Sequence, residues 1–107
     1  MDPAEIRWKR LISYLNEYCH LPLQREDVAR LLNVSADHVT YLFRVRAGES
    51  FPAYLNRLRV ERACRLLASG TLSVKEVAHQ CGFCNSSYFI KVFRRFTGNS
   101  PGRLTGR

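Results

Sequence analysis

The sequence has no apolar run close to the ~18 residues that a membrane-spanning helix needs. Its start, Met1-Asp2-Pro3, also lacks the basic and apolar regions of a secretory signal peptide. We therefore expect a cytoplasmic protein with no membrane partner. In that reducing compartment the four cysteines should be thiols rather than disulfides.

Patterns typical of catalysis or metal binding are also missing. His20, His38 and His79 form no spacing pattern with a nucleophile, and no glycine-rich phosphate loop is present. Cys81 and Cys84 have the spacing of a zinc-binding pair, but a structural zinc site needs four ligands and no second pair exists. Core packing of Cys81 with a turn thiol at Cys84 is favoured over a redox pair. The sequence thus predicts no enzyme, no cofactor and no metal.

Acidic residues are scarce in one part of the chain only. Residues 1–43 contain five Lys/Arg and six Asp/Glu, whereas residues 44–107 contain twelve and three. The net charge is +8 and the isoelectric point is near 9.9. Such an uneven basic chain is expected to bind a polyanion, although charge alone equally allows a solvated surface that aids solubility.

Strand patterns are absent, and apolar residues recur with helical spacing throughout. We expect an all-α fold of about seven helices, the last weakened by glycines. The sixth helix is expected to bury Phe89, Val92, Phe93 and Phe96. The helices are predicted to start near Pro3, Gln24, Ser35, Phe51, Ser73, Asn85 and Ser100, with caps at Asp2, Ser35, Ser50 and Ser73.

The chain repeats one pattern twice. Val28-Ala29, Asn33-Val34 and Phe43-Arg44 recur as Val77-Ala78, Gly82-Phe83 and Phe93-Arg94, and a Gly and a Ser follow each copy. The offset is 49 residues before the turn and 50 after it, so the second turn has one extra residue. Each copy reads as helix, tight turn, helix.

The repeat meets the physical requirements of a helix-turn-helix motif. Ala29 and Ala78 let two helices approach closely, while Asn33 and Gly82 tolerate an unusual backbone conformation in the turn. We therefore predict helix-turn-helix subdomains at residues 1–49 and 70–107, joined by a long linker helix at residues 50–69. A plain helical bundle with a duplicated packing unit remains the alternative.

One further combination of residues is specific to a family. Residues 54–63 read Tyr-Leu-Asn-Arg-Leu-Arg-Val-Glu-Arg-Ala, and are followed by Leu66-Leu67, Val77-Ala78, Gly82-Phe83, Ser87-Tyr88-Phe89 and Val92-Phe93-Arg94. With these motifs, residues 5–101 resemble the DNA-binding domain of the AraC/XylS family of bacterial transcription regulators. The resemblance implies two homeodomain-like subdomains that insert the third and sixth helices into adjacent major-groove segments of double-stranded DNA.

The resemblance also implies partners. It implies RNA polymerase as a second partner and favours an activator, although the residues themselves do not separate activation from repression. Nothing precedes Met1, so we expect either a monomeric, stand-alone member or a C-terminal piece of a regulator that would dimerise through its missing domain. The family's aromatic and Arg after Ser-Pro are replaced by Leu104 and Thr105, which leaves the last helix open.

The predicted site residues lie on the outward faces of the third and sixth helices. The resemblance assigns base reading on the third helix, and Lys91 suits a guanine best. Asp37 equally fits a purely structural role at the helix start, and Tyr88 fits either the core or a phosphate. The base-reading candidates are Asp37, Thr40, Tyr41, Ser86, Ser87, Ile90 and Lys91, and the phosphate-binding candidates are Ser35, Arg44, Arg46, Asn85, Tyr88, Arg94 and Arg95.

Two other functions compete with gene regulation. A helix-turn-helix module of a DNA-repair alkyltransferase would need an activated acceptor cysteine, held by zinc or in a Pro-Cys-His setting, and the sequence has neither. A protein-interaction helical bundle would need an apolar surface patch, whereas the outward faces here are polar and basic.

Overall fold

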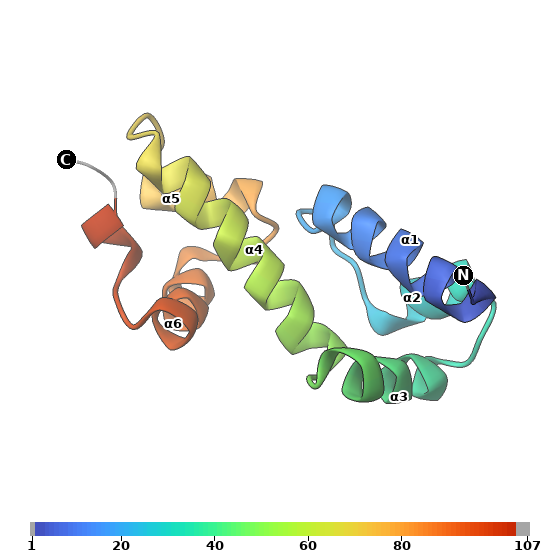
Figure 1. Ribbon diagram of the computed structural model, residues 1–107. Coiled ribbons are helices and arrows are strands. Elements are labelled where there is room, and N and C mark those ends of the chain that lie inside the picture. Colours follow the sequence, from blue (N-terminus) through green and yellow to red (C-terminus); the bar gives the residue numbers. More distant parts are fainter. Residues whose placement is uncertain (1, 105–107) are drawn as a thin grey trace. The chain divides into compact units, whose positions relative to one another are not determined.

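The computed structural model describes residues 2–104, and over that range every regular element is helical. The all-α prediction is confirmed, with one turn of 3-10 helix in place of the seventh helix (Figure 1). Thr105, one of the residues that put that helix in question, lies outside the described residues. The elements are α1 (Pro3–Tyr18), α2 (Arg25–Leu32), α3 (Ala36–Ala47), α4 (Phe51–Ala68), α5 (Val74–Gln80), α6 (Ser86–Thr97) and the 3-10 turn η1 (Pro101–Leu104).

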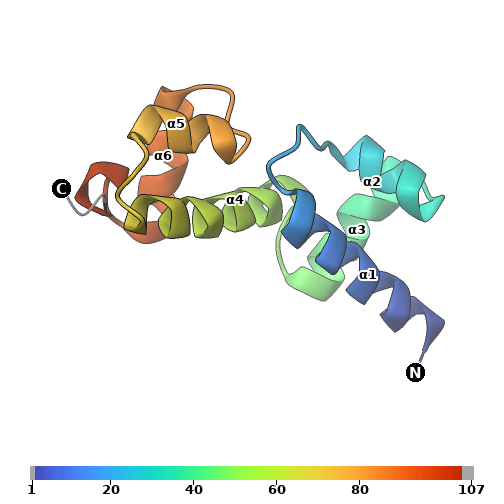
Figure 2. The same cartoon turned by 90° about the horizontal axis from the view of Figure 1, so that it is seen from above.

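The chain divides into two compact units, and the boundary between them falls between Leu55 and Asn56, inside α4. In the first unit α2 and α3 lie side by side, and in the second α5 packs against α6, as Figures 1 and 2 show from two directions. The expected linker helix is therefore divided between the units: its first turn packs in one and the remainder in the other.

Polar side chains start the helices where the sequence predicts. Asp2 accepts a hydrogen bond from the Ala4 N–H at 3.1 Å, with Pro3 in the first helical position. Ser73 and Glu76 form a reciprocal capping box, with N···O distances of 3.0 and 3.1 Å. Each cap satisfies backbone donors that an isolated helix end would leave unpaired.

Phe43 is the centre of the core of the first unit. Its ring is fully buried and meets the rings of Trp8, Phe51 and Tyr54 with centroid distances of 5.0, 5.3 and 5.4 Å. The near-perpendicular arrangements place ring edges against ring faces, which aromatic pairs prefer. Because these partners come from α1 and α4, one side chain of α3 joins three helices.

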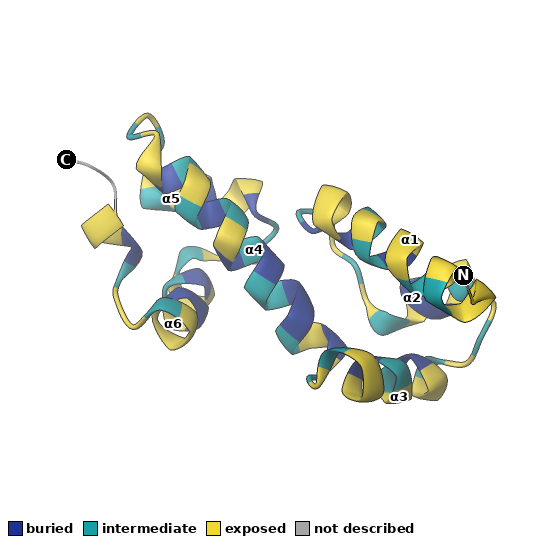
Figure 3. Ribbon diagram, viewed as in Figure 1, coloured by how far each residue is buried: buried dark blue, intermediate teal, exposed yellow. Residues whose placement is uncertain are grey.

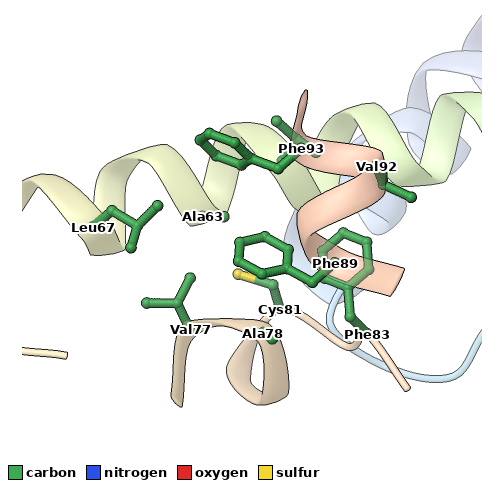
Figure 4. Packing of buried hydrophobic residues seen from close by; sticks show 10 residues of the cluster. Ala63, Leu67, Val77, Ala78, Cys81, Phe83, Phe89, Val92 and Phe93 are labelled. Carbon is green, nitrogen blue, oxygen red and sulfur yellow. The ribbon is translucent and has the colours of Figure 1, made fainter. Parts of the chain in front are cut away.

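The core of the second unit is built from α4, α5 and α6 (Figure 4). The Phe89 ring lies 4.9 Å from Phe83 and 5.6 Å from Phe93, centroid to centroid. Cys81 is fully buried among them, as the core-packing interpretation predicted. The cluster consists of Val60, Ala63, Leu67, Val77, Ala78, Cys81, Phe83, Phe89, Val92 and Phe93.

One core prediction is wrong. Phe96 is 37% exposed rather than buried with the other aromatic residues of α6. It lies in the last turn of the helix, one residue before its end at Thr97. The equivalent residue of the first unit is Arg46, which is also exposed, so this position of the repeat lies at the edge of the core in both units.

Among the described residues, no helix combines the length and apolar character needed to cross a membrane.

Replacing Phe43 by Ala should destabilise the first unit by about 3–5 kcal/mol, because it leaves a cavity where three aromatic rings now meet. Urea unfolding followed by far-ultraviolet circular dichroism measures the loss. Val45→Ala, on the same helix but 63% exposed, is the matched control and should change stability by no more than about 0.5 kcal/mol. Equal losses in the two variants would contradict the central position of Phe43.

Candidate nucleic-acid interface

The turn between α2 and α3 is held by two backbone hydrogen bonds. The Val34 N–H donates to the Ala29 carbonyl at 2.9 Å, and the Asn33 N–H donates to the Arg30 carbonyl at 3.2 Å. Asn33 adopts a left-handed conformation with φ of 57°. This pairing of six- and four-residue closures is the Schellman motif, which ends a helix and reverses the chain sharply.

The turn between α5 and α6 has the same two bonds. The Phe83 N–H donates to the Ala78 carbonyl at 3.0 Å, the Gly82 N–H donates to the His79 carbonyl at 3.2 Å, and Gly82 has φ of 88°. The repeat seen in the sequence is thus a repeat of backbone geometry. Cys84 is the extra residue of the second turn, and it is exposed.

Side-chain caps start both second helices. The Ser35 hydroxyl accepts from the His38 N–H at 3.0 Å, and the side-chain Oδ1 of Asn85 accepts from the Tyr88 N–H at 2.8 Å. The oxygens of these two predicted phosphate ligands are therefore engaged with the helix. The Ser35 hydroxyl proton and the Asn85 amide group retain donor capacity towards an anion.

The outward face of α3 carries a mixture of polar and apolar groups, and exposed residues are visible along the helix in Figure 3. The Asp37 side chain is 96% exposed and Tyr41 is 59% exposed. Thr40 is only partly exposed, and its hydroxyl accepts a hydrogen bond from Arg25 of α2 at 2.8 Å. Arg44 is exposed near the end of the helix.

Two exposed side chains of α3 were not among the predicted site residues. Val45 lies one helical turn after Tyr41, and His38 stacks on Tyr41 with ring centroids 5.9 Å apart. Extending the outward face by one turn from Tyr41 would have found Val45. Together with Tyr41 they form an apolar and aromatic surface on a helix whose outward face was predicted to be polar.

The outward face of α6 is cationic. Ser87, Lys91, Arg94 and Arg95 are exposed, which places most of the predicted contacts of this helix at the surface. Ser86 is only partly exposed. Ile90 is also partly exposed, and it packs against the core of the second unit. Its side chain is therefore shared between the core and the surface.

Tyr88 joins α6 to α4. Its hydroxyl accepts a hydrogen bond from the Asn56 amide at 3.2 Å, and its ring lies 6.1 Å from that of Phe83. Tyr88 nevertheless remains 43% exposed. The ring therefore touches the edge of the core, while the hydroxyl keeps its own proton to donate, and the phosphate contact of Tyr88 stays a prediction.

The Arg46 side chain contacts residues of α1. Its guanidinium forms an ion pair with Glu5 at 2.7 Å and lies 5.8 Å from the centre of the Trp8 ring. Glu5 and Arg46 are far apart in the sequence, so the sequence alone gave no sign of this pair. Arg46 therefore already has a structural role, whereas the neighbouring Arg44 points to the surface.

No disulfide joins the four cysteines, and no group of three or more His, Cys, Asp or Glu residues within 2–104 has a metal-binding arrangement. Cys19 and Cys81 are buried, while Cys84 is exposed. Burial raises the pKa of the Cys64 thiol, with the charge of Glu61 acting in the same direction and that of Arg65 opposing it. Cys84 is thus the accessible thiol of the chain, directly before the cap of α6.

Two helix-turn-helix units with exposed second helices define the class of helix-turn-helix regulator domains. The family described as "Helix-turn-helix domain", which is of the AraC type, matches residues 28–107. The chain belongs to this AraC-type helix-turn-helix family, which comprises DNA-binding transcription regulators rather than enzymes.

Curated relatives agree with this assignment. The uncharacterized HTH-type transcriptional regulator YijO of Escherichia coli K12 is 42% identical over 98 residues, which cover 92% of this chain and 35% of YijO. The HTH-type transcriptional regulator GlxA of Rhizobium meliloti is 37% identical over 86 residues, which cover 80% of this chain and 26% of GlxA. The chain thus spans about a third or less of the length of these relatives.

Solved structures match over nearly the whole chain. The C-terminal domain of AraT, a response regulator from Geobacillus stearothermophilus, has a TM-score of 0.84 at 31% identity, covering 91% of this chain and 81% of that one. The DNA-binding domain of AdpA, a global transcriptional factor solved in complex with a target DNA, has a TM-score of 0.85 at 30% identity, covering 91% and 87%.

Alkylation of the native protein with iodoacetamide should modify Cys84 first, because the other three thiols are buried or partly buried. Mass spectrometry of the digested protein at successive times measures the order. Cys84→Ser should remove the fast reaction and leave the slow ones unchanged. Rapid modification of Cys81 in the folded protein would contradict the closed core of the second unit.

Proposed function

We propose that the chain is a sequence-specific reader of double-stranded DNA that inserts α3 and α6 into adjacent segments of the major groove. The observation that supports this most directly is the duplicated turn. Two copies of the same backbone closure each present an exposed second helix, on a chain of net charge +8. A packing repeat in a plain bundle would not require the second helix to stay exposed in both copies.

The two helices would read DNA by different chemistry. The repeat aligns Tyr41 with Lys91 and Val45 with Arg95. Lys91 suits guanine, whose O6 and N7 accept hydrogen bonds, with Ser86, Ser87 and the exposed part of Ile90 beside it. On α3, Tyr41 and Val45 suit the methyl group of thymine. The first half-site should therefore contain a thymine and the second a guanine.

Phosphate contacts would hold the register of the two helices. Arg44, Arg94 and Arg95 are exposed cations in the last turns of α3 and α6. Ser35, Asn85 and Tyr88 can add neutral donors at or near the two helix starts. Arg46 would have to leave Glu5 to reach a phosphate, so we assign it to the fold instead.

The complete regulator would act through further partners. The curated relatives are roughly two and a half to three times as long as this chain, which supports an additional regulatory domain for effector binding and dimerisation. RNA polymerase is the second macromolecular partner that we propose, since a DNA-bound regulator of the activator kind acts on the polymerase.

The decisive experiment is selection of bound sites from a random duplex library. Two half-sites should emerge about one helical turn, ~10 base pairs, apart. A single half-site would overturn the double insertion, and the absence of any enriched site would overturn sequence-specific binding.

Lys91→Ala should weaken binding to the selected site by about 1–3 kcal/mol and relax one base position of the second half-site, because it removes a base contact. Arg94→Ala should instead weaken binding to all sequences alike and lower the salt dependence of the affinity. Fluorescence anisotropy on specific and random duplexes over a salt series measures both. Lys75→Ala, which removes an exposed cation from α5, is the control and should do neither.

A further inference from the structure

One residue outside α3 contacts two of the side chains that are assigned to base reading there. Arg25, the first residue of α2, donates from Nη1 to the Thr40 hydroxyl at 2.8 Å and to Asp37 Oδ1 at 3.4 Å. Its Nε bonds to Glu26 at 3.1 Å, which anchors the guanidinium to its own helix. None of the base-reading candidates of the third helix is a cation, and Arg25 places a guanidinium directly beside two of them.

The second unit provides an internal comparison. The offsets of the repeat align Arg25 with Val74 and Thr40 with Ile90. Val74 and Ile90 both pack against the apolar core of the second unit. The motif therefore closes with two apolar residues at these positions, and its geometry does not require the Arg25–Thr40 hydrogen bond. A polar pair that the fold can replace by an apolar one points to a role in binding.

The hydrogen bonds of Thr40 determine what it can offer to a base. A threonine hydroxyl has one donor hydrogen and two acceptor lone pairs. The Thr40 hydroxyl donates to the Ala36 carbonyl at 3.4 Å and accepts from Arg25, so one lone pair is left. The Asp37 carboxylate is purely an acceptor. Both side chains thus present acceptors, and neither presents a donor.

We propose that Arg25 is a positioning residue for base selection by the first helix-turn-helix unit. This rests on the proposed function. In a helix, threonine divides between two side-chain rotamers, and the bond from Arg25 selects the one in which the hydroxyl acts as an acceptor. Such a surface favours bases with an amino group in the major groove, which are cytosine and adenine, over guanine and thymine. The guanidinium also offsets the charge of Asp37 near the DNA phosphates.

The test is a comparison of base preferences in four proteins. Sites are selected from one random duplex library with four proteins: wild type, Arg25→Val, Thr40→Val and the double variant. The half-site whose base preference changes in Lys91→Ala is the one bound by the second unit, so the other half-site belongs to the first unit. Wild type should prefer cytosine or adenine at one position of the first half-site. Arg25→Val and Thr40→Val should each reduce that preference about three- to tenfold, the size of one ordinary hydrogen bond.

The double variant separates an indirect role of Arg25 from a direct one. If Arg25 acts through Thr40, the double variant should lose no more preference than either single variant. Additive losses would mean that Arg25 contacts DNA itself and would overturn the proposal. Arg25→Lys keeps a cationic donor but loses the planar fork that bonds to Thr40 and Glu26 at once, so it should retain only part of the preference.

Arg30→Val is the matched control, because it removes the same charge from the same helix at a residue that is paired with Asp27. It should leave the base preferences of both half-sites unchanged. Three outcomes would each overturn the role of Arg25. The base preferences could be unchanged in Arg25→Val, or they could change equally in both half-sites. The wild type could also prefer guanine or thymine at the affected position. Failure of the wild type to select any site would instead overturn the proposed function itself.

Discussion

The closure of each turn by a left-handed residue and two backbone hydrogen bonds is the constraint on which the rest of the structure depends. It ends α2 and α5 and reverses the direction of the chain before the next helix begins. Ala29 and Ala78, whose carbonyls accept the longer-range bond, are both buried, so the two helices of each unit can approach closely there. Everything exposed on α3 and α6 is exposed because these turns hold the opposite faces against a core.

The two units meet this constraint with different residues. Gly82 adopts the left-handed conformation at little steric cost, whereas Asn33 belongs to the small group of other residues that tolerate it. Beyond the turn the units also diverge in charge: the outward face of α3 combines an acid with apolar groups, and that of α6 is cationic. A common backbone therefore supports two chemically distinct surfaces.

Much of the fold could be predicted from local sequence, because its signals lie within a few residues of each other. The caps at Asp2 and Ser73, the left-handed Asn33 and the burial of Cys81 follow from short-range patterns. The burial of Phe96 was wrongly predicted, since helical spacing identifies a face but not where the covering core ends.

Contacts between elements could not be predicted in this way. Arg46 forms an ion pair with Glu5, which is 41 residues away in the sequence, and Arg25 donates a hydrogen bond to Thr40, which is 15 residues away. Neither pair produces a periodic pattern in the sequence, because each depends on long side chains that come into contact only after the helices have packed. The choice of α3 and α6 as the reading helices stays a prediction, and the sequence could not supply the residues of other elements that contact their side chains.

The extra turn residue and the unlike outer surfaces mean that the duplication is not a symmetry. If the two helices read DNA as proposed, the chain would contact different bases in the two possible orientations on the duplex. A single copy would therefore recognise an oriented, non-palindromic sequence. An oriented site lets one molecule distinguish upstream from downstream without a second subunit.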